Sequence, residues 1–211
     1  MAKHRKQNQL TGIHNAPMGQ SAAVNRSIEM RPDGESVMAI SLDIGSAPAP
    51  ERKYLAEIAS VAISENSIKL LFGQNKITAE IRNLLIVDIS PTALHSLLRS
   101  VEEIKSPSYE DVVNMSGVKP QSLTDIKTEP EQTIALKANL ISTCANGYDA
   151  CFDFYYLSPF ATLKLASSDK VDIDPVVRVD IQTGLFMAIL NELKKVAKVF
   201  PPPEEGKNEK F

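Results

Sequence analysis

The chain has 211 residues, of which 43 % are hydrophobic and none is tryptophan, so it is long enough for one or two packed domains. Its formal net charge of −3 is uneven, because residues 1–28 hold four cations and no acid, which leaves −7 for the remainder. No apolar run reaches the roughly 18 residues of a membrane helix. The basic start lacks the apolar segment of a secretory signal and the chain has only two cysteines, so we expect a cytoplasmic protein.

Residues 1–50 are predicted to be a flexible basic arm and hinge. Residues 1–36 are polar without a sustained hydrophobic period, which favours a disordered tail; the alternative is an arm that orders on a neighbouring subunit or a phosphate backbone. Residues 37–44 allow a strand, and residues 45–50 form the hinge. Four cations without interleaved aromatic residues are weak evidence for nucleic-acid binding, so we assign them to a protein partner. These partner-binding candidates are Lys3, Arg5, Lys6 and Arg26.

Residues 51–105 are predicted to form a first β-β-β-α unit. Residues 54–63 and 68–72 are typical of a hairpin, and a strand at 84–89 runs into an amphipathic helix. Ser90 is placed to cap this helix and Pro91 to be its first residue, where proline loses no helical hydrogen bond. The helix carries one apolar stripe, formed by Leu94, Leu97, Leu98, Val101 and Ile104.

Residues 106–135 are predicted to be a linker, long enough for two units to pack side by side. The segment is polar and contains three prolines, and a short helix is expected at 109–115 behind Ser108. Residues 201–211 begin with three prolines, stop the last helix and are expected to be a disordered tail.

Residues 136–200 are predicted to form a second β-β-β-α unit that begins with another hairpin. Even-numbered positions are the more apolar ones in both of its strands. A three-residue loop at 145–147 pairs Leu140 with Phe152 and keeps one apolar face, with Gly147 in a left-handed conformation. A two-residue turn would instead place Leu140 beside Asp153, so we favour the longer loop.

The second unit is ten residues longer than the first. We assign the extra residues to a further strand and loop at 158–167, and Thr183 is the expected cap of the last helix.

The two units are predicted to be tandem copies of one pattern. Val87-Asp88-Ile89 and Val179-Asp180-Ile181 are identical and 92 residues apart, and the helix stripes match at the same spacing, beginning with Leu94 and Phe186. The hairpins match at a spacing of 82 residues. We therefore expect an α+β fold in which two antiparallel sheets, each with a helix on one face, pack as an intramolecular pseudo-dimer.

The cysteines and histidines are assigned structural or surface positions. The predicted register puts Cys144 on the apolar face of its hairpin and Cys151 on the other, so no disulfide is expected between them. A cysteine pair without a nearby histidine supplies too few ligands for a metal site. His4 and His14 lie in the arm, and His95 is interpreted as a surface or boundary side chain of the first helix rather than an acid–base group.

Asp88 and Asp180 occupy matching positions in the two units. If a pseudo-twofold brought them together, their carboxylates could serve acid–base or cation chemistry; the favoured alternative is a pair of solvated strand positions. The chain has no Gly-rich phosphate loop, Gly-x-Ser-x-Gly elbow or His-Glu-x-x-His helix. We therefore assign no catalytic, cofactor-binding or metal-binding residue and expect a protein that is not an enzyme.

Residues 54–104 carry a family resemblance. The hairpin ends in Leu71-Phe72-Gly73, and Ile89-Ser90-Pro91 opens the helix after the next strand. This order resembles a small bacterial domain family of unknown function (number 3467), described as a β-rich unit that ends in a Ser-Pro-initiated helix. The second unit departs from it, because Phe154-Tyr155-Tyr156 replaces Phe-Gly and Gln182-Thr183 replaces Ser-Pro. The resemblance implies no activity. The layout of strands before a long helix is also similar to that of SecB-like chaperones, as an analogy of fold.

These features favour a non-catalytic protein-interaction or assembly module that binds protein partners, or further copies of itself, through its arm and sheet edges. The alternative is a SecB-like chaperone or antitoxin-associated factor that binds unfolded or partner chains in an exposed apolar groove. An enzyme using Asp88 and Asp180 is the third hypothesis. Nucleic acid is a disfavoured partner, and no membrane, small-molecule substrate or cofactor is indicated.

Overall fold

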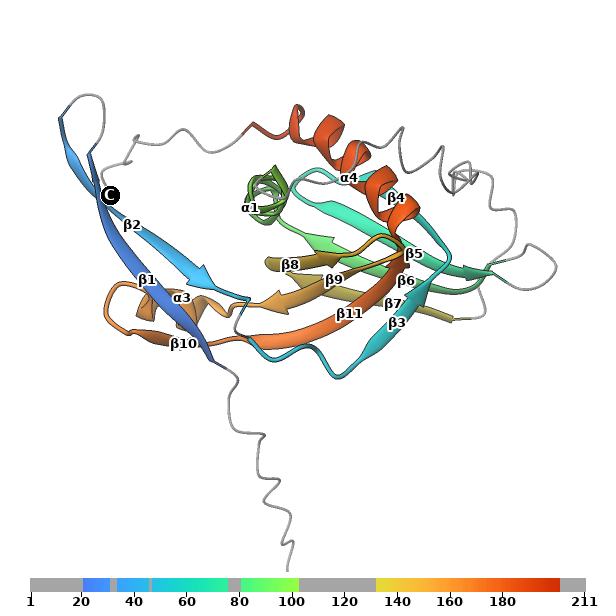
Figure 1. The fold of residues 1–211 in the computed structure, drawn as a ribbon, viewed down its shortest axis with the longest axis horizontal. Coiled ribbons are helices and arrows are strands. Elements are labelled where there is room, and N and C mark those ends of the chain that lie inside the picture. The colour runs from blue at the N-terminus through green and yellow to red at the C-terminus, as the bar shows by residue number, and fades with distance from the viewer. Residues whose placement is uncertain (1–20, 31–33, 46, 76–80, 103–131, 202–211) are drawn as a thin grey trace, which may run out of the picture.

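The computed structural model describes residues 21–30, 34–45, 47–75, 81–102 and 132–201. The fold is mixed α+β, with mostly antiparallel strands in three sheets (Figure 1). The first sheet has the order β4-β5-β6-β7 and consists of Ile58–Ile63, Ile68–Asn75, Ile81–Ile89 and Gln132–Ala138. The second sheet has the order β3-β11-β9-β8 and consists of Lys53–Ala56, Asp174–Gln182, Asp149–Tyr156 and Leu140–Ala145. The arm sheet has the order β10-β1-β2 and consists of Lys170–Asp172, Ser21–Met30 and Ser36–Asp43.

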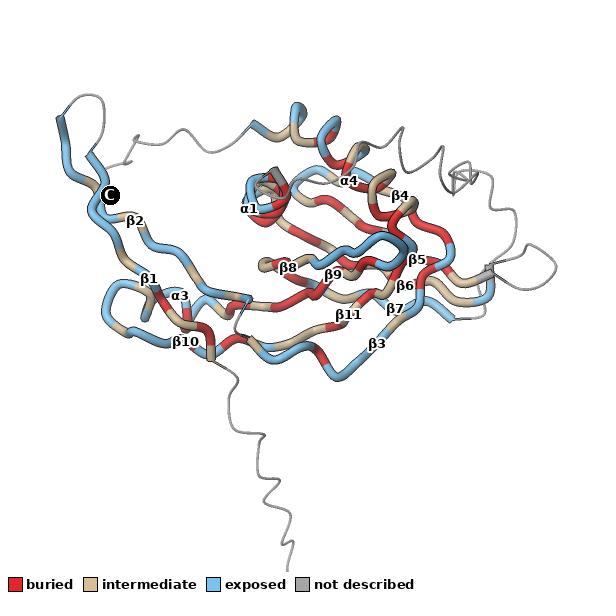
Figure 2. Tube along the Cα trace, viewed as in Figure 1, coloured by how far each residue is buried: buried red, intermediate tan, exposed pale blue. Residues whose placement is uncertain are grey.

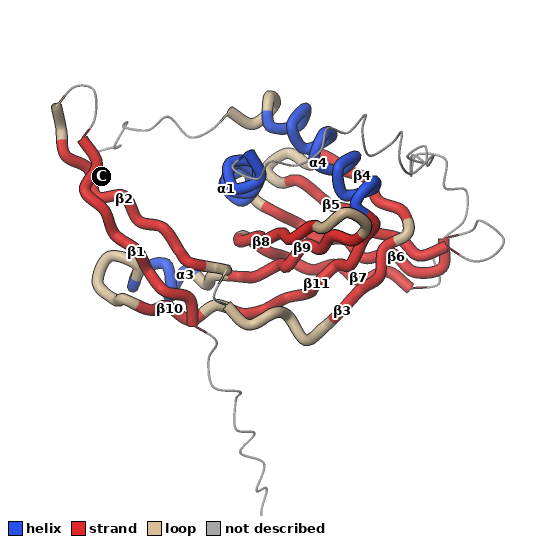
Figure 3. Tube along the Cα trace, viewed as in Figure 1, coloured by secondary structure: helices blue, strands red, loops and turns tan. Residues whose placement is uncertain are grey.

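Three helices complete the described chain: α1 (Pro91–Glu102), α3 (Pro159–Lys164) and α4 (Thr183–Ala197). The two long helices contact each other and lie on the same side of the two four-stranded sheets, whereas α3 lies apart from them beside the arm sheet (Figure 3). We call the two four-stranded sheets with α1 and α4 the body.

One hydrophobic core fills the body. Strand residues alternate between this core and the outside, as they must when one face of a sheet is covered. Four phenylalanines from both sheets and α4 meet at its centre, with the rings of Phe152 and Phe186 4.8 Å apart and those of Phe72 6.0 Å from Phe152 and 6.1 Å from Phe154. Leu94 of α1 and Phe186 of α4 are both buried in the same core.

Each four-stranded sheet contains one strand that pairs in parallel, which corrects the expected purely antiparallel sheets. β3 runs parallel to β11, and β7 runs parallel to β6. After a break of one residue, at Glu57 or Asn139, the chain crosses to the other sheet and continues as β4 or β8. α1 then packs against β8 and α4 against β4, so the body has one shared core.

Several predictions for the first half are confirmed. β4 and β5 form the expected hairpin over residues 58–63 and 68–73, closed by a backbone hydrogen bond of 2.9 Å from Ser64 to Ser67; residues 54–56 of the predicted first strand belong instead to β3 in the second sheet. The Ser90 hydroxyl accepts a hydrogen bond from the Ala93 N–H at 3.2 Å, and Pro91 is the first helical residue. The predicted short helix at 109–115 lies outside the described residues, as do residues 202–211.

The predicted register of the second hairpin is wrong. Leu140 of β8 lies opposite Tyr155 of β9 rather than Phe152. The Asn146 side-chain oxygen accepts hydrogen bonds of 2.8 Å from the N–H groups of Tyr148 and Asp149, and this turn does not need a left-handed glycine. Gly147 accordingly lacks the positive φ that Gly34 has. The prediction failed because it assumed one buried face, whereas β9 is buried on both faces, with Tyr155 packed into a second, smaller core.

Three other boundaries are corrected. Residues 158–167 hold α3 rather than a strand, because Pro159 follows the N-cap Ser158, whose hydroxyl accepts from the Ala161 N–H at 3.2 Å. Thr183 is the first residue of α4 and not its cap; its hydroxyl donates instead to the Asn146 carbonyl at 3.0 Å. The expected linker ends earlier than predicted, since β7 begins at Gln132.

Candidate protein-interaction surface

The largest departure from the predicted layout is the arm, because residues 21–30, predicted to be flexible, form β1. The strand allowed at residues 37–44 is confirmed as β2 (Ser36–Asp43). The two strands pair along the whole of β2, from Ala23 with Asp43 to Met30 with Ser36, and project from the body (Figure 1). The predicted hinge at 45–50 follows directly after them. We call residues 21–30 and 34–43 the arm hairpin.

The base of the arm hairpin is packed. Ala22 and Val24 are buried, and partly buried Leu42 packs beside them. Their partners lie around α3 and β10: the small core also contains Tyr155, Leu157, Ala161, Val171 and Ile173. A two-stranded hairpin alone is marginally stable in water, so this small core supports the arm.

The outer half of the arm hairpin exposes one apolar face. Even-numbered residues of both strands share a face, because Ile28 lies opposite Met38 and Arg26 opposite Ile40. Going outward along this face, burial gives way to exposure (Figure 2). We call the four exposed side chains the arm face: Ile28, Met30, Met38 and Ile40 are 79 %, 75 %, 55 % and 38 % exposed.

The edges of the arm hairpin are also open. Among the described strands, β2 has no neighbour on its outer side, and β10 pairs with β1 only as far as Ala23. The opposite face of the outer half carries the polar residues Asn25, Ser27, Glu29 and Ser41 together with Val37 and Ala39, which are smaller than the arm-face residues and only partly exposed. The arm is thus an amphipathic hairpin with its apolar side open and free edges for strand pairing.

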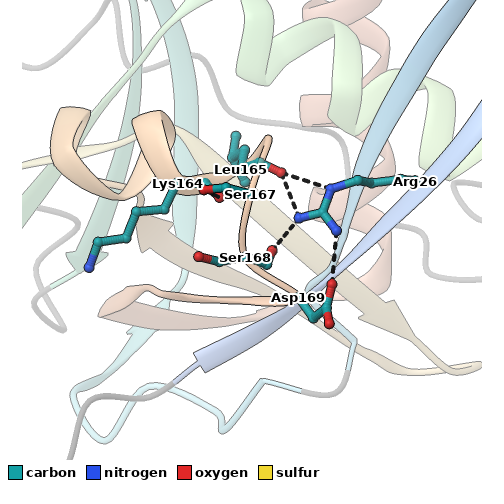
Figure 4. A network of polar contacts seen from close by, with 6 residues as sticks. All are labelled: Arg26, Lys164, Leu165, Ser167, Ser168 and Asp169. Carbon is teal, nitrogen blue, oxygen red and sulfur yellow. Dashed lines mark hydrogen bonds and ion pairs between the residues drawn. The ribbon is translucent and has the colours of Figure 1, made fainter.

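Arg26 fixes the arm hairpin to the rest of the chain (Figure 4). Its guanidinium donates to the Leu165 carbonyl at 3.1 Å from Nε and at 2.9 Å from Nη2, and also to the Ser168 carbonyl. Nη1 pairs with Asp169 at 2.9 Å, but that carboxylate is 94 % exposed, so solvent screens the ion pair strongly. The carbonyl contacts, together with the Val24 N–H donating to the Asp169 carbonyl at 2.9 Å, hold β1 against the loop after α3.

The predicted partner-binding cations therefore divide into two groups. Lys3, Arg5 and Lys6 lie outside the described residues. Arg26 lies in β1, and its charge is engaged within the chain, so the prediction that it belongs to a flexible arm is wrong. The residues of the arm face were missed by sequence reasoning, although two signals were available. Apolar side chains alternate at 22, 24, 28 and 30, and the Pro-Asp-Gly sequence at 32–34 is typical of a turn.

A second group of exposed apolar side chains lies on α3, next to the base of the arm. Ala161 faces the small core, whereas Phe160 and Leu163 on the other side of the helix are 81 % and 79 % exposed. Exposed apolar side chains therefore occur on two neighbouring elements at this end of the molecule.

Polar residues on the outer face of the second sheet form an ion pair. Arg178 of β11 donates from Nε and Nη2 to the two carboxylate oxygens of Asp153 on β9, each at 2.6 Å. These hydrogen bonds raise the pKa of Arg178. Burial, followed by the nearby Asp153 charge, raises the pKa of Tyr155 to about 12 and also raises the pKa of the Cys151 thiol.

Asp88 and Asp180 do not meet. Asp88 lies on the first sheet between Lys69 and Lys137, and Asp180 lies on the second sheet opposite Cys151. Both alternate with strand residues that are buried in the shared core, so they point away from it on two different sheets. Within the described ranges, no three His, Cys, Asp or Glu side chains gather closely enough to hold a metal ion.

His95 connects the two long helices. Its Nε2 contacts the carbonyl oxygen of Phe200, just beyond α4, so the ring bridges α1 and the end of α4.

The chain is thus a mixed α+β protein with an anchored, amphipathic arm. It matches no protein-family profile, curated protein or solved structure in the comparisons made. Over the part of the chain that the structure describes, no helix has the length and hydropathy needed to cross a membrane.

Proposed function

We propose that this protein is a non-catalytic interaction or assembly module that binds protein partners through the arm hairpin. The observation that carries the proposal is the arm face: four large apolar side chains on a hairpin whose base is packed and pinned by Arg26. A pre-formed hairpin loses little conformational freedom on binding, which favours recognition of a defined partner.

The free edge of β2 suggests how a partner binds. An extended segment of the partner can pair with β2 through main-chain hydrogen bonds, which places its own apolar side chains beside the arm face. Methionine adapts its shape to irregular surfaces, and two of the four arm-face residues are methionine. A second copy of this chain is one such partner, since the same edge can pair with itself.

We further propose that the body consists of two tandem copies of one β-β-β-α unit, related by an internal pseudo-twofold. The support is that each unit gives equivalent elements to the other. β3 of the first unit pairs with β11 of the second as β7 of the second pairs with β6 of the first, and α4 packs on β4 as α1 packs on β8. In this arrangement the arm hairpin lies outside the repeat. Neither unit of the body therefore covers the arm face.

A SecB-like chaperone is the second candidate function. The exposed Phe160 and Leu163 beside the arm favour it, because several separate apolar sites suit binding of unfolded chains. A chaperone of this kind binds many sequences, whereas an assembly module binds one partner in fixed stoichiometry.

The experiment compares the full chain with a double variant, Ile28→Ser with Met38→Ser, in pull-downs from the native host. These residues are direct neighbours across the arm hairpin and largely exposed, so the free energy of unfolding should change by less than about 1 kcal/mol. The matched control, Ser27→Thr with Ala39→Ser, changes a paired site on the opposite face. We expect a stoichiometric partner, or self-association seen by sedimentation, that the arm-face variant loses and the control keeps.

Retention of that partner by the arm-face variant would contradict the proposed arm interface. Suppression of the aggregation of a denatured client enzyme by the wild type, without any stoichiometric partner, would favour the chaperone instead.

A further inference from the structure

Cys144 and Cys151 lie directly opposite each other in the β8–β9 ladder. This corrects the prediction that they point to opposite faces, since residues paired across an antiparallel ladder share a face. Cys144 is exposed, Cys151 is partly buried, and both are free thiols. The chain's only two cysteines are therefore a facing pair.

The ladder sets the separation of the two residues. Directly opposed residues in an antiparallel pair have Cα atoms about 4.5 to 5.5 Å apart. Disulfide-bonded residues have Cα separations of about 4.4 to 6.8 Å, so the backbone already satisfies this requirement. The Cβ atoms of opposed residues are about 4.5 to 5.5 Å apart, and a disulfide needs about 3.5 to 4.5 Å, so closure requires a shift of roughly one ångström.

The position in the fold permits that shift. β8 is an edge strand of the second sheet, and the pair lies near the turn in which Asn146 and Asp149 share a backbone hydrogen bond of 2.8 Å. The Cys144 side chain is exposed and is not part of the buried core. Packing in a core accounts for the presence of a buried cysteine. It does not account for an exposed cysteine that lies opposite a second thiol.

The surroundings distinguish the two thiols. Cys151 has Asp180 opposite it on β11 and Asp153 two residues along β9, with Arg178 paired to Asp153. Burial, followed by the Asp153 carboxylate, raises the pKa of the Cys151 thiol and so disfavours its thiolate, and the same partial burial limits access to reagents. Cys144 on the outer strand is therefore the sulfur that external reagents reach first.

We propose that Cys144 and Cys151 are a reversible dithiol–disulfide site that exchanges with small-molecule disulfides such as glutathione disulfide. The Cys144 thiolate attacks one sulfur of glutathione disulfide; the S–S bond breaks, one glutathione leaves as thiolate, and Cys144 carries the other. The Cys151 thiolate then attacks the Cys144 sulfur and expels the second glutathione. The protein loses two electrons and two protons, and one glutathione disulfide becomes two glutathione molecules.

The geometry also implies that the bond is labile. Its ring spans only residues 144–151, and a short loop constrains the unfolded chain less than a long one does. The required Cβ shift and the exposure of Cys144 both favour easy reduction. The site therefore acts as a reversible modification and not as a structural staple.

The test treats the folded full chain with glutathione disulfide and measures intact mass and free thiols. We expect the wild type to lose both thiols, to become two hydrogens lighter and to retain no glutathione, at a rate independent of protein concentration. Cys151→Ser should stop at one glutathione attached to Cys144, and Cys144→Ser should react more slowly. Dithiothreitol should restore both thiols in the wild type.

A wild-type product that keeps glutathione on Cys144 beside a free Cys151, or that forms only intermolecular disulfides, would overturn the proposal. Peptide mapping of the wild type alone distinguishes these products, so the result does not depend on how the serine variants fold.

Discussion

In β5 of the body Ile68, Leu70 and Phe72 are fully buried, whereas in β1 of the arm Ile28 and Met30 are mostly exposed. Both strands carry apolar residues at even-numbered positions, with Arg26 of β1 and Gln74 of β5 as the exceptions, and both belong to antiparallel pairs. The body covers its apolar face with a second sheet and two helices, and the arm covers only its base. Alternation therefore predicts which side of a strand is apolar, but not whether this chain itself supplies the cover.

Core truncations test the body side of this comparison with the largest expected effect. Leu94→Ala and Phe186→Ala each leave a cavity in the shared core, so each should lower the free energy of unfolding by about 2 to 5 kcal/mol in urea denaturation. The exposed Leu163→Ala is the control and should change it by less than about 0.5 kcal/mol. A small loss from either core variant would contradict a single core built from both halves.

Removal of the Arg26 guanidinium tests the anchoring of the arm. Arg26→Ala eliminates three hydrogen bonds to backbone carbonyls and should cost about 1 kcal/mol of stability while accelerating amide exchange in β1 and β2. Arg26→Lys should restore little, because an ammonium group cannot reproduce the planar set of donors. Unchanged exchange in β1 in both variants would show that the small core alone holds the arm.

The ionisation of Tyr155, which is buried in the small core, makes the stability of the protein depend on pH. Burial raises its pKa from 10.0 to about 12, so the unfolded chain ionises first as the pH rises. Its contribution to stability is complete below pH 10 and decreases between about pH 10 and 12. Tyr155→Phe removes only a long hydrogen bond of 3.3 Å to the Pro48 carbonyl and should make the alkaline loss of stability shallower than in the wild type. Equal losses for both proteins between about pH 10 and 12 would contradict this prediction.

The sequence predicted elements whose local signals agree with their surroundings. The hairpin of β4 and β5, the strand ending at Ile89 and the Ser90 cap of α1 follow from alternation on one buried face and from capping chemistry. The register of β8 and β9 did not follow, because Tyr155 and Phe154 are buried on opposite faces of one strand. No local rule indicates that a second core lies behind a strand.

The candidate site was predicted less well than the body. Charge drew the sequence interpretation to Arg26, whereas its guanidinium is used internally and the exposed surface is apolar. The arm strands lie in a segment of polar composition, and their stability depends on residues more than 100 positions away, as the pairing of Ala22 with Val171 illustrates. The composition of a segment does not show whether residues far away in the sequence will stabilise its strands.

The parallel pairing of β3 with β11 has a consequence for biosynthesis. Tyr54 lies opposite Val179, so β3 has to wait until a segment synthesised more than 100 residues later has left the ribosome before its sheet can close. Contacts of such long sequence separation slow folding and delay closure of this sheet until β11 has been synthesised. The same connectivity means that a polypeptide cut between Glu102 and Gln132 yields two fragments, each lacking a strand that only the other provides, and these fragments should reassemble when mixed.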